Sequence, residues 1–156
     1  MRQIRVDTGW FDGRWEGVDQ RQDIRRQWER LLHRAGFLDE QERAFLETTA
    51  EQGGRITRLA RLTGRSSASV RRQVRDIARR LLGRELDAML QRPEAFSALE
   101  KSCLRDHLIR KRPLACVAEG LGISVYHVRK TLAAARGKVQ RLNTEQKNEK
   151  DRVLRK

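Results

Sequence analysis

The sequence predicts an all-α protein made of two tandem helix-turn-helix units that follow an N-terminal aromatic segment and helix. Three observations support this class. Strong helix formers, above all Arg, Leu, Ala, Glu and Gln, dominate the 156 residues, and only two prolines occur. Apolar residues recur at spacings of three and four along most of the chain. Two stretches, "LTGRSSASVRRQVRDIAR" and "LGISVYHVRKTLAAAR", share a Gly-x-Ser turn followed by an amphipathic pattern.

Residues 1–36 form the first segment of the predicted organisation. Three aromatic residues stand among glycines near its start: Trp10, Phe11 and Trp15. We expect this segment to pack on a helical surface, because its interleaved acidic residues would repel phosphate; base stacking is the alternative. A helix from Asp19 to about Ala35 follows, and Gly36 stands where a C-terminal cap is expected.

The first helix-turn-helix unit is predicted over residues 37–92. Its opening helix is expected to end at the glycines 53–54, and a short helix over about 57–63 follows. After the next turn, apolar residues keep helical spacing almost to the end of the unit. The spacing therefore predicts one long helix that continues through Met89 and stops at Pro93.

The second helix-turn-helix unit is predicted over residues 93–142 on the same plan. Pro113 opens its short helix, because proline is well accommodated where a helix begins. The apolar stripe of its last helix reaches Val139. Beyond the unit, the polar tail 143–156 has almost no apolar residues, so we expect it to be frayed or disordered.

The two units align without a gap at an offset of 58 residues. The aligned pairs include capping boxes, turn glycines, capping serines and inward valines: Asp39–Glu42 with Ser97–Glu100, Gly64 with Gly122, Ser66 with Ser124, and Val70 with Val128. Helical periodicity alone would reproduce the apolar stripes but not the aligned caps and turns. The alignment therefore predicts an internal repeat.

Each repeat has the arrangement of a helix-turn-helix, whose second helix can enter the major groove of DNA. The inward stripe fixes which positions of that helix face outward, and these positions are the expected DNA-binding residues. They are Ser66, Ser67, Ala68, Arg71, Arg72 and Arg75 in the first unit, and Ser124, Val125, Tyr126, Arg129 and Lys130 in the second. The serines cap the helix where phosphate would bind, small residues permit close approach, and Arg or Lys reaches guanine or phosphate.

A solvated helix face without a ligand is the structural alternative for the basic residues. However, residues 55–84 hold ten arginines and a single acid, Asp76, whereas solvated helices usually mix charges of both signs. The whole chain has 35 basic and 21 acidic residues, a formal net charge of +14, and a pI of about 11.2. This balance favours a polyanionic partner, nucleic acid ahead of an acidic membrane surface.

Other classes of function find little support in the sequence. No apolar run approaches the roughly 18 residues of a membrane helix. No signal-peptide pattern opens the chain either, so we expect a cytoplasmic, nucleoid-associated protein without membrane contact. Cys103 and Cys116 lack zinc spacing and are expected to be reduced thiols in or near the core. Because no clustered carboxylates or nucleophile constellation occurs, we expect no enzyme, no metal and no cofactor.

The second unit contains "LEKSCLRDHLIRKRPLACVAEGLGISVYHVRKTLAAARGKVQRL". Its features are an early capped helix, "VAEGLGIS", a Val four residues after the Ser, and "AAAR" before a basic end. In these features residues 96–142 resemble region 4 of bacterial sigma factors, which reads the −35 promoter element, and residues 38–82 do so more faintly. The resemblance implies DNA contacts at Val125, Tyr126, Arg129 and Lys130 and a phosphate contact at Ser124. It also makes RNA polymerase a candidate partner.

A complete sigma factor would need region 2 as well, and residues 1–37 are too short for it. The turn is also shared with other families, including the output domains of response regulators. We therefore expect a sequence-specific, double-stranded-DNA-binding transcription regulator that uses tandem helix-turn-helix units. The alternatives are a sigma-like factor associated with RNA polymerase and a basic RNA- or ribosome-associated protein. The sequence leaves open which unit reads bases, the target site, the sign of regulation and the oligomeric state.

Overall fold

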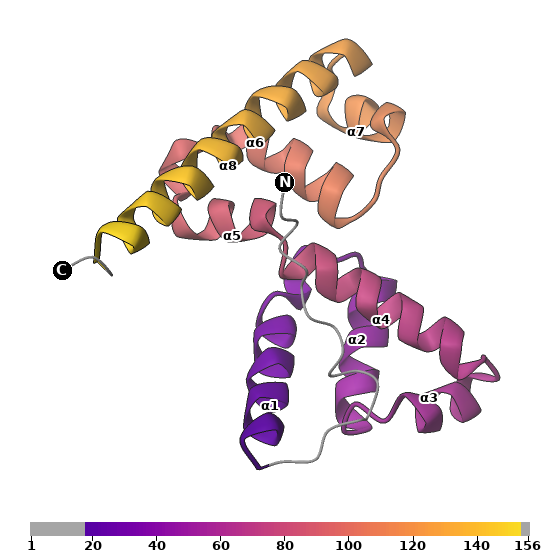
Figure 1. Ribbon diagram of the computed structural model, residues 1–156. Coiled ribbons are helices and arrows are strands. Elements are labelled where there is room, and N and C mark those ends of the chain that lie inside the picture. Colours follow the sequence, from indigo (N-terminus) through magenta and orange to yellow (C-terminus); the bar gives the residue numbers. More distant parts are fainter. Residues whose placement is uncertain (1–17, 154–156) are drawn as a thin grey trace. The chain divides into compact units, whose positions relative to one another are not determined.

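The computed structural model describes the backbone of residues 18–153 and the side chains of residues 24–149 and 151. Within this part every regular element is helical and no β-strand occurs, so the predicted all-α class is confirmed. The chain divides into two compact units, Met1–Leu82 and Gly83–Lys156 (Figure 1). The aromatic segment lies outside the described residues, and its packing stays a prediction.

The first unit consists of helices that enclose the apolar face of its last helix. Its described elements are α1 (Val18–His33), the 3-10 turn η2 (Ala35–Phe37), α2 (Glu40–Glu51), α3 (Ile56–Thr63) and α4 (Ser67–Leu81). Fully buried side chains form the core: Leu31, Leu46, Val70, Val74, Ile77 and Leu81. The stripe on α4, at spacings of four, three and four, is the amphipathic pattern of a helix packed on one side.

The second unit is built along its long last helix. Its elements are α5 (Arg84–Gln91), the 3-10 turn η3 (Pro93–Ala95), α6 (Ala98–Cys103), the π-helical turn η4 (Leu104–Ile109), α7 (Leu114–Leu121) and α8 (Val125–Val153). Helix α8 packs on α5, α6 and α7 (Figure 1). The fully buried core includes Leu86, Cys103, Leu104, Val128 and Ala135.

The internal repeat extends over both units at the offset of 58 residues. Helix α2 corresponds to α6 together with η4, α3 corresponds to α7, and α4 and α8 begin at equivalent residues. The two 3-10 turns also correspond, and α1 and α5 end at the equivalent residues His33 and Gln91. The sequence pattern reveals the repeat only from Asp39 onward, whereas the structure begins it one helix earlier.

The predicted end of the first helix is wrong. Helix α1 ends at His33 instead of Ala35, and Asp19 lies inside it. Gly36 lies within η2 and has no left-handed φ, so it does not cap α1 in the expected way. The 3-10 turn instead carries the chain into the core, where Ala35 and Leu38 are buried.

The long helix predicted from Ser66 through Met89 is interrupted. Helix α4 ends at Leu81, whose carbonyl accepts a hydrogen bond from Arg34 Nη1 at 2.7 Å. A new helix, α5, begins after Gly83, which takes the extended conformation of an N-cap (φ −74, ψ 158). Helix α5 packs on α8 and so belongs to the second unit, and the two units divide before α5 instead of after it.

The polar tail is helical as far as the structure describes it. Helix α8 continues without a break to Val153, so the expected fraying or disorder is wrong for residues 143–153. The side-chain amide of Gln146 donates a hydrogen bond to the side chain of Gln91 on α5. Glu, Gln and Lys are strong helix formers, which favours a helix in this segment. The contact with Gln91 connects the segment to α5.

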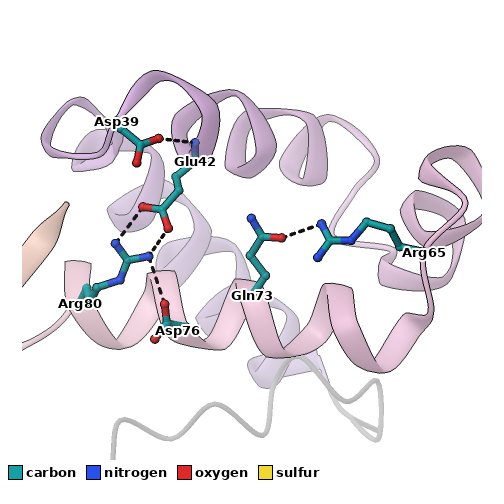
Figure 2. Close-up of polar contacts among 6 residues, drawn as sticks. All are labelled: Asp39, Glu42, Arg65, Gln73, Asp76 and Arg80. Carbon is teal, nitrogen blue, oxygen red and sulfur yellow. Dashed lines mark hydrogen bonds and ion pairs between the residues drawn. The ribbon is translucent and has the colours of Figure 1, made fainter. Parts of the chain in front are cut away.

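A partly buried ion pair joins equivalent residues in both units. In the first unit, Arg80 on α4 donates to both carboxylate oxygens of Glu42 on α2, at 2.5 and 2.8 Å (Figure 2). In the second unit, Lys138 Nζ on α8 lies 2.8 Å from Glu100 Oε2 on α6. The paired residues are 38 positions apart in both units. The repeat therefore preserves a charge pair as well as a backbone.

The two predicted capping boxes turn out differently. Ser97 and Glu100 form the complete box, in which each side chain accepts a hydrogen bond from the other residue's amide. In the first unit Asp39 Oδ1 accepts from the Glu42 amide at 2.9 Å. The Glu42 carboxylate is directed to Arg80 instead of back to the helix start, so only half of the predicted box is found there.

The Glu100 carboxyl makes the stability of the second unit depend on pH. Burial alone would raise its pKa, but hydrogen bonds from Lys138 and Ser97 and the Lys138 charge outweigh burial and hold the pKa below its ordinary value of 4.5. A carboxylate with a lowered folded-state pKa stabilises fully above the ordinary value and loses that contribution as the pH falls through the lowered value.

We therefore expect the difference in unfolding free energy between wild type and Glu100→Gln to shrink as the pH falls from about 6 to about 3. Urea unfolding at each pH measures it. Lys138→Met should flatten the dependence, because the lysine supplies much of the lowering. A difference that stays constant across this range would contradict the assignment.

Candidate nucleic-acid interface

The turn between the short and the long helix has the same backbone geometry in both units. Gly64 adopts φ 64 and ψ 19, and Gly122 adopts φ 65 and ψ 31, in the left-handed region that favours glycine. The amide after each glycine donates to an alanine carbonyl five residues earlier at 3.0 Å, Ala60 in the first unit and Ala118 in the second. These bonds close the end of the short helix and set the direction of the next one.

Small and fully enclosed side chains hold the two helices of each turn together. Ala60 and Ala118 are each 4% exposed, and side chains of this size let the helices approach closely. Val70 on α4 and Val128 on α8 are completely buried, as the sequence pattern predicts. The orientation of each second helix, and with it the outward face, is therefore fixed by packing.

The predicted serine caps are confirmed in both units. Ser66 Oγ accepts from the Ser69 amide at 3.1 Å, and Ser124 Oγ accepts from the His127 amide at 3.2 Å. A cap of this kind satisfies one of the first helical amides and leaves others at the helix start for water or an anion. Both serines thus stand where a phosphate could approach, with their own oxygens engaged as acceptors.

The first turns of α8 present an open face. Arg129 and Lys130 are exposed, and Tyr126 is 70% exposed, whereas Val125 is half-buried. The Tyr126 ring meets the His127 ring edge to face, with 6.3 Å between centroids and an interplanar angle of 87°. Positions 126, 129 and 130 are neighbours on a helix surface, so the phenol and the two cations share one face.

The corresponding face of α4 is less open. Ala68 and Arg72 are exposed, but Ser67, Arg71 and Arg75 are half-buried. The expected outward arginines therefore do not all stand free in solvent, although their counterparts on α8 do. The structure thus has one open candidate face on α8, at Tyr126, Arg129 and Lys130, and one partly covered candidate face on α4.

The outward side of α3 carries residues that the sequence reasoning did not single out. Arg58 and Arg61 are exposed, and Leu62 is 67% exposed. The inward stripe of α3, with Leu59 and Ala60 buried, could have identified these positions, because residues at helical spacing opposite a buried stripe face solvent.

The loop before α7 holds another unforeseen basic pair, Lys111 and Arg112, both exposed. Lys111 adopts a left-handed φ of 56, which is uncommon for a residue with a side chain. Its counterpart at the repeat offset is Gly53, with φ 66. The alignment could have predicted this conformation, because the two units share the turn that leads into the short helix.

No protein-family model, curated protein or solved structure matches the chain. Its function is therefore inferred from the arrangement of its own side chains. Of the helices described, none combines the length and the apolar run that a bilayer crossing would require.

The described residues include Cys, His, Asp and Glu, the side-chain types that bind metal ions most often. In that part of the chain, no group of three or more His, Cys, Asp or Glu residues is arranged to hold a metal ion. Burial, and then the charge of Asp106, raise the pKa of the Cys103 thiol, which favours its protonated and weakly nucleophilic form. Cys116 is exposed on α7, so its expected place in or near the core is wrong.

Proposed function

We propose that the protein is a sequence-specific, double-stranded-DNA-binding transcription regulator that uses tandem helix-turn-helix units. The observation that carries this proposal is the open face of Tyr126, Arg129 and Lys130 on the first turns of α8. The major groove of B-DNA admits an α-helix, and its base edges offer acceptors that Arg and Lys recognise. The net charge of +14 adds an attraction that does not depend on sequence.

The two units contribute differently in this proposal. Helix α8 offers an aromatic ring and two cations on an open face, which suits contacts with base edges. The first unit has ten arginines and one acid over residues 55–84, but Arg71 and Arg75 on its second helix are half-buried. We assign base recognition mainly to the second unit and phosphate attraction mainly to the arginines on α4 of the first unit.

Under this proposal the protein works in the cytoplasm, associated with the nucleoid. The sigma-like features of residues 96–142 add RNA polymerase as a candidate protein partner. A basic RNA-associated protein is the competing function, because the charge alone would suit it equally well.

Two matched double variants test the assignment after a binding site has been selected from random duplex DNA. Arg129→Ala with Lys130→Ala should weaken binding to the selected duplex by about tenfold to a hundredfold and reduce the preference over random DNA. Arg71→Ala with Arg72→Ala removes the residues at the same repeat positions. It should weaken both duplexes about equally and lower the salt dependence of binding.

Arg141→Ala with Lys147→Ala controls for the loss of two charges, because these exposed residues lie several turns farther along α8. It should change affinity only slightly. If neither double variant weakens duplex binding, the groove-reading assignment is wrong. A salt-resistant preference for structured RNA over every duplex tested would support the competing RNA function instead.

A further inference from the structure

The outward face of α3 combines an exposed leucine with arginines. Leu62 is 67% exposed, and Arg58, Arg61 and Arg65 beside it are exposed as well. These residues follow one another at spacings of three, one and three, so they lie along one side of the helix and its terminal turn. We call this set the α3 surface.

Folding of the unit does not require these side chains. At the repeat offset, Cys116, Glu119, Gly120 and Ile123 take the places of Arg58, Arg61, Leu62 and Arg65. Helix α7 nevertheless has the same length as α3 and the same turn after it. An exposed leucine flanked by cations is thus peculiar to the first unit.

One of the cations is held in place by its neighbours. Arg65 Nη1 donates to Gln73 Oε1 at 2.6 Å, and Nη2 donates to Ser69 Oγ at 3.1 Å (Figure 2 shows the contact with Gln73). Its guanidinium carbon also lies 5.7 Å from the centre of the Phe45 ring. These contacts hold the Arg65 guanidinium against side chains of α2 and α4, and a fixed cation loses less entropy when it binds.

We propose that the α3 surface is a docking site for an acidic protein segment that presents a large apolar side chain. The arginines supply charge complementarity to carboxylates, and Leu62 supplies apolar area to be buried in the contact. Duplex DNA would complement the arginines of this surface but not Leu62. The first helix of a helix-turn-helix crosses the phosphate backbone, where a leucine finds no apolar partner.

Synthetic peptides provide the probe. A fluorescent, Glu-rich helical peptide with leucines one turn apart should bind the full-length protein, and the same peptide with serines in place of leucines should bind more weakly. Leu62→Ser should weaken the leucine peptide by about tenfold, measured by fluorescence anisotropy, and leave the serine peptide unchanged. Arg58→Ser with Arg61→Ser should weaken both peptides, while Leu62→Met should retain binding.

Leu90→Ser on α5 is the matched control. Leu90 is 43% exposed, but Asp87, one turn earlier on α5, is acidic, so this variant should bind both peptides as the wild type does. Equal melting temperatures of the two serine variants would confirm that binding and not folding is measured. The substitutions Arg129→Ala and Lys130→Ala should leave peptide binding intact, which separates this site from the proposed DNA face.

Three results would overturn the proposal. The first is peptide binding that does not respond to Leu62→Ser. The second is an equal loss of affinity for duplex DNA and for the leucine peptide in that variant, which would assign the surface to the DNA interface. The third is a protein dimer in sedimentation that Leu62→Ser dissociates, which would make a second copy of the chain the occupant.

Discussion

Replacing Leu104 with alanine is expected to lower the free energy of unfolding of the second unit by about 3 kcal/mol. The side chain is completely buried, and it stands at the point where α6 passes into the π-helical turn η4. Its truncation removes apolar contacts and leaves a cavity that a packed core fills only in part. Urea unfolding followed by circular dichroism measures the loss, and amide hydrogen exchange locates it in α5–α8.

Leu46→Ala is the matched control, because Leu46 is the repeat counterpart of Leu104 and is equally buried. It should reduce amide protection in α1–α4 and leave α5–α8 protected. A loss below about 1 kcal/mol for Leu104→Ala would mean that the π-helical turn lets the site collapse. Exchange that speeds up only in the first unit would contradict the placement of Leu104 in the second core.

The turns and caps are predictable from sequence because they are determined by local chemistry. A left-handed residue such as Gly64 has to be tolerated where the short helix ends, and glycine tolerates it best. Ser66, Ser97 and Ser124 each cap a helix as predicted, because a hydroxyl can accept from an amide three residues ahead. These signals depend on a few adjacent residues, so they can be recognised without knowledge of the fold.

The helix ends that were mispredicted depend on contacts distant in sequence. Leu86 follows Leu81 by five residues instead of three or four, so the α4 stripe is interrupted there. However, Leu82, Leu86 and Met89 keep spacings of four and three, which conceals the break at Gly83 and the turn to a new core. The helical tail likewise has the composition of a disordered segment. Its contact between Gln146 and Gln91 joins residues 55 positions apart, which no local pattern reveals.

In the candidate site, too, the features set by local spacing are predictable and those set by distant contacts are not. The spacing of Tyr126, Arg129 and Lys130 against a buried valine is enough to predict the open face of α8. Spacing alone does not predict that Arg71 and Arg75 on α4 are half-buried, because it does not show which residues cover them. Leu62 is 67% exposed, which its apolar character alone does not predict.

Glu42 illustrates a competition that sequence alone does not resolve. Its spacing from Asp39 predicts a return hydrogen bond to the helix start, but Arg80, 38 residues later, takes the carboxylate. A bidentate pair between two charged groups is stronger than a single hydrogen bond from a backbone amide to the carboxylate. The alignment at offset 58 pairs Arg80 with Lys138, so it shows that both repeats have a cation at this position. It does not show which carboxylate that cation binds.

Arg80→Met should therefore destabilise the first unit by about 3 kcal/mol, because removing one member of a buried ion pair leaves the other charge uncompensated. The Arg80 side chain is only 9% exposed, and its Nη2 lies 2.5 Å from Glu42 and 3.2 Å from Asp76 (Figure 2). Methionine of similar length would leave the Glu42 and Asp76 carboxylates without their shared cation. Urea unfolding near neutral pH, with amide exchange in α2 and α4, measures the effect.

The equivalent change in the second unit, Lys138→Met, should be milder. The Lys138 side chain is 33% exposed, so water can replace part of its interaction with Glu100, and the capping box still donates the Ser97 amide to that carboxylate. Adding Glu42→Gln to Arg80→Met should recover part of the lost stability, because a neutral amide does not need a cation. Equal losses for Arg80→Met and Lys138→Met, or no recovery in the double variant, would show that packing and not charge compensation dominates at Arg80.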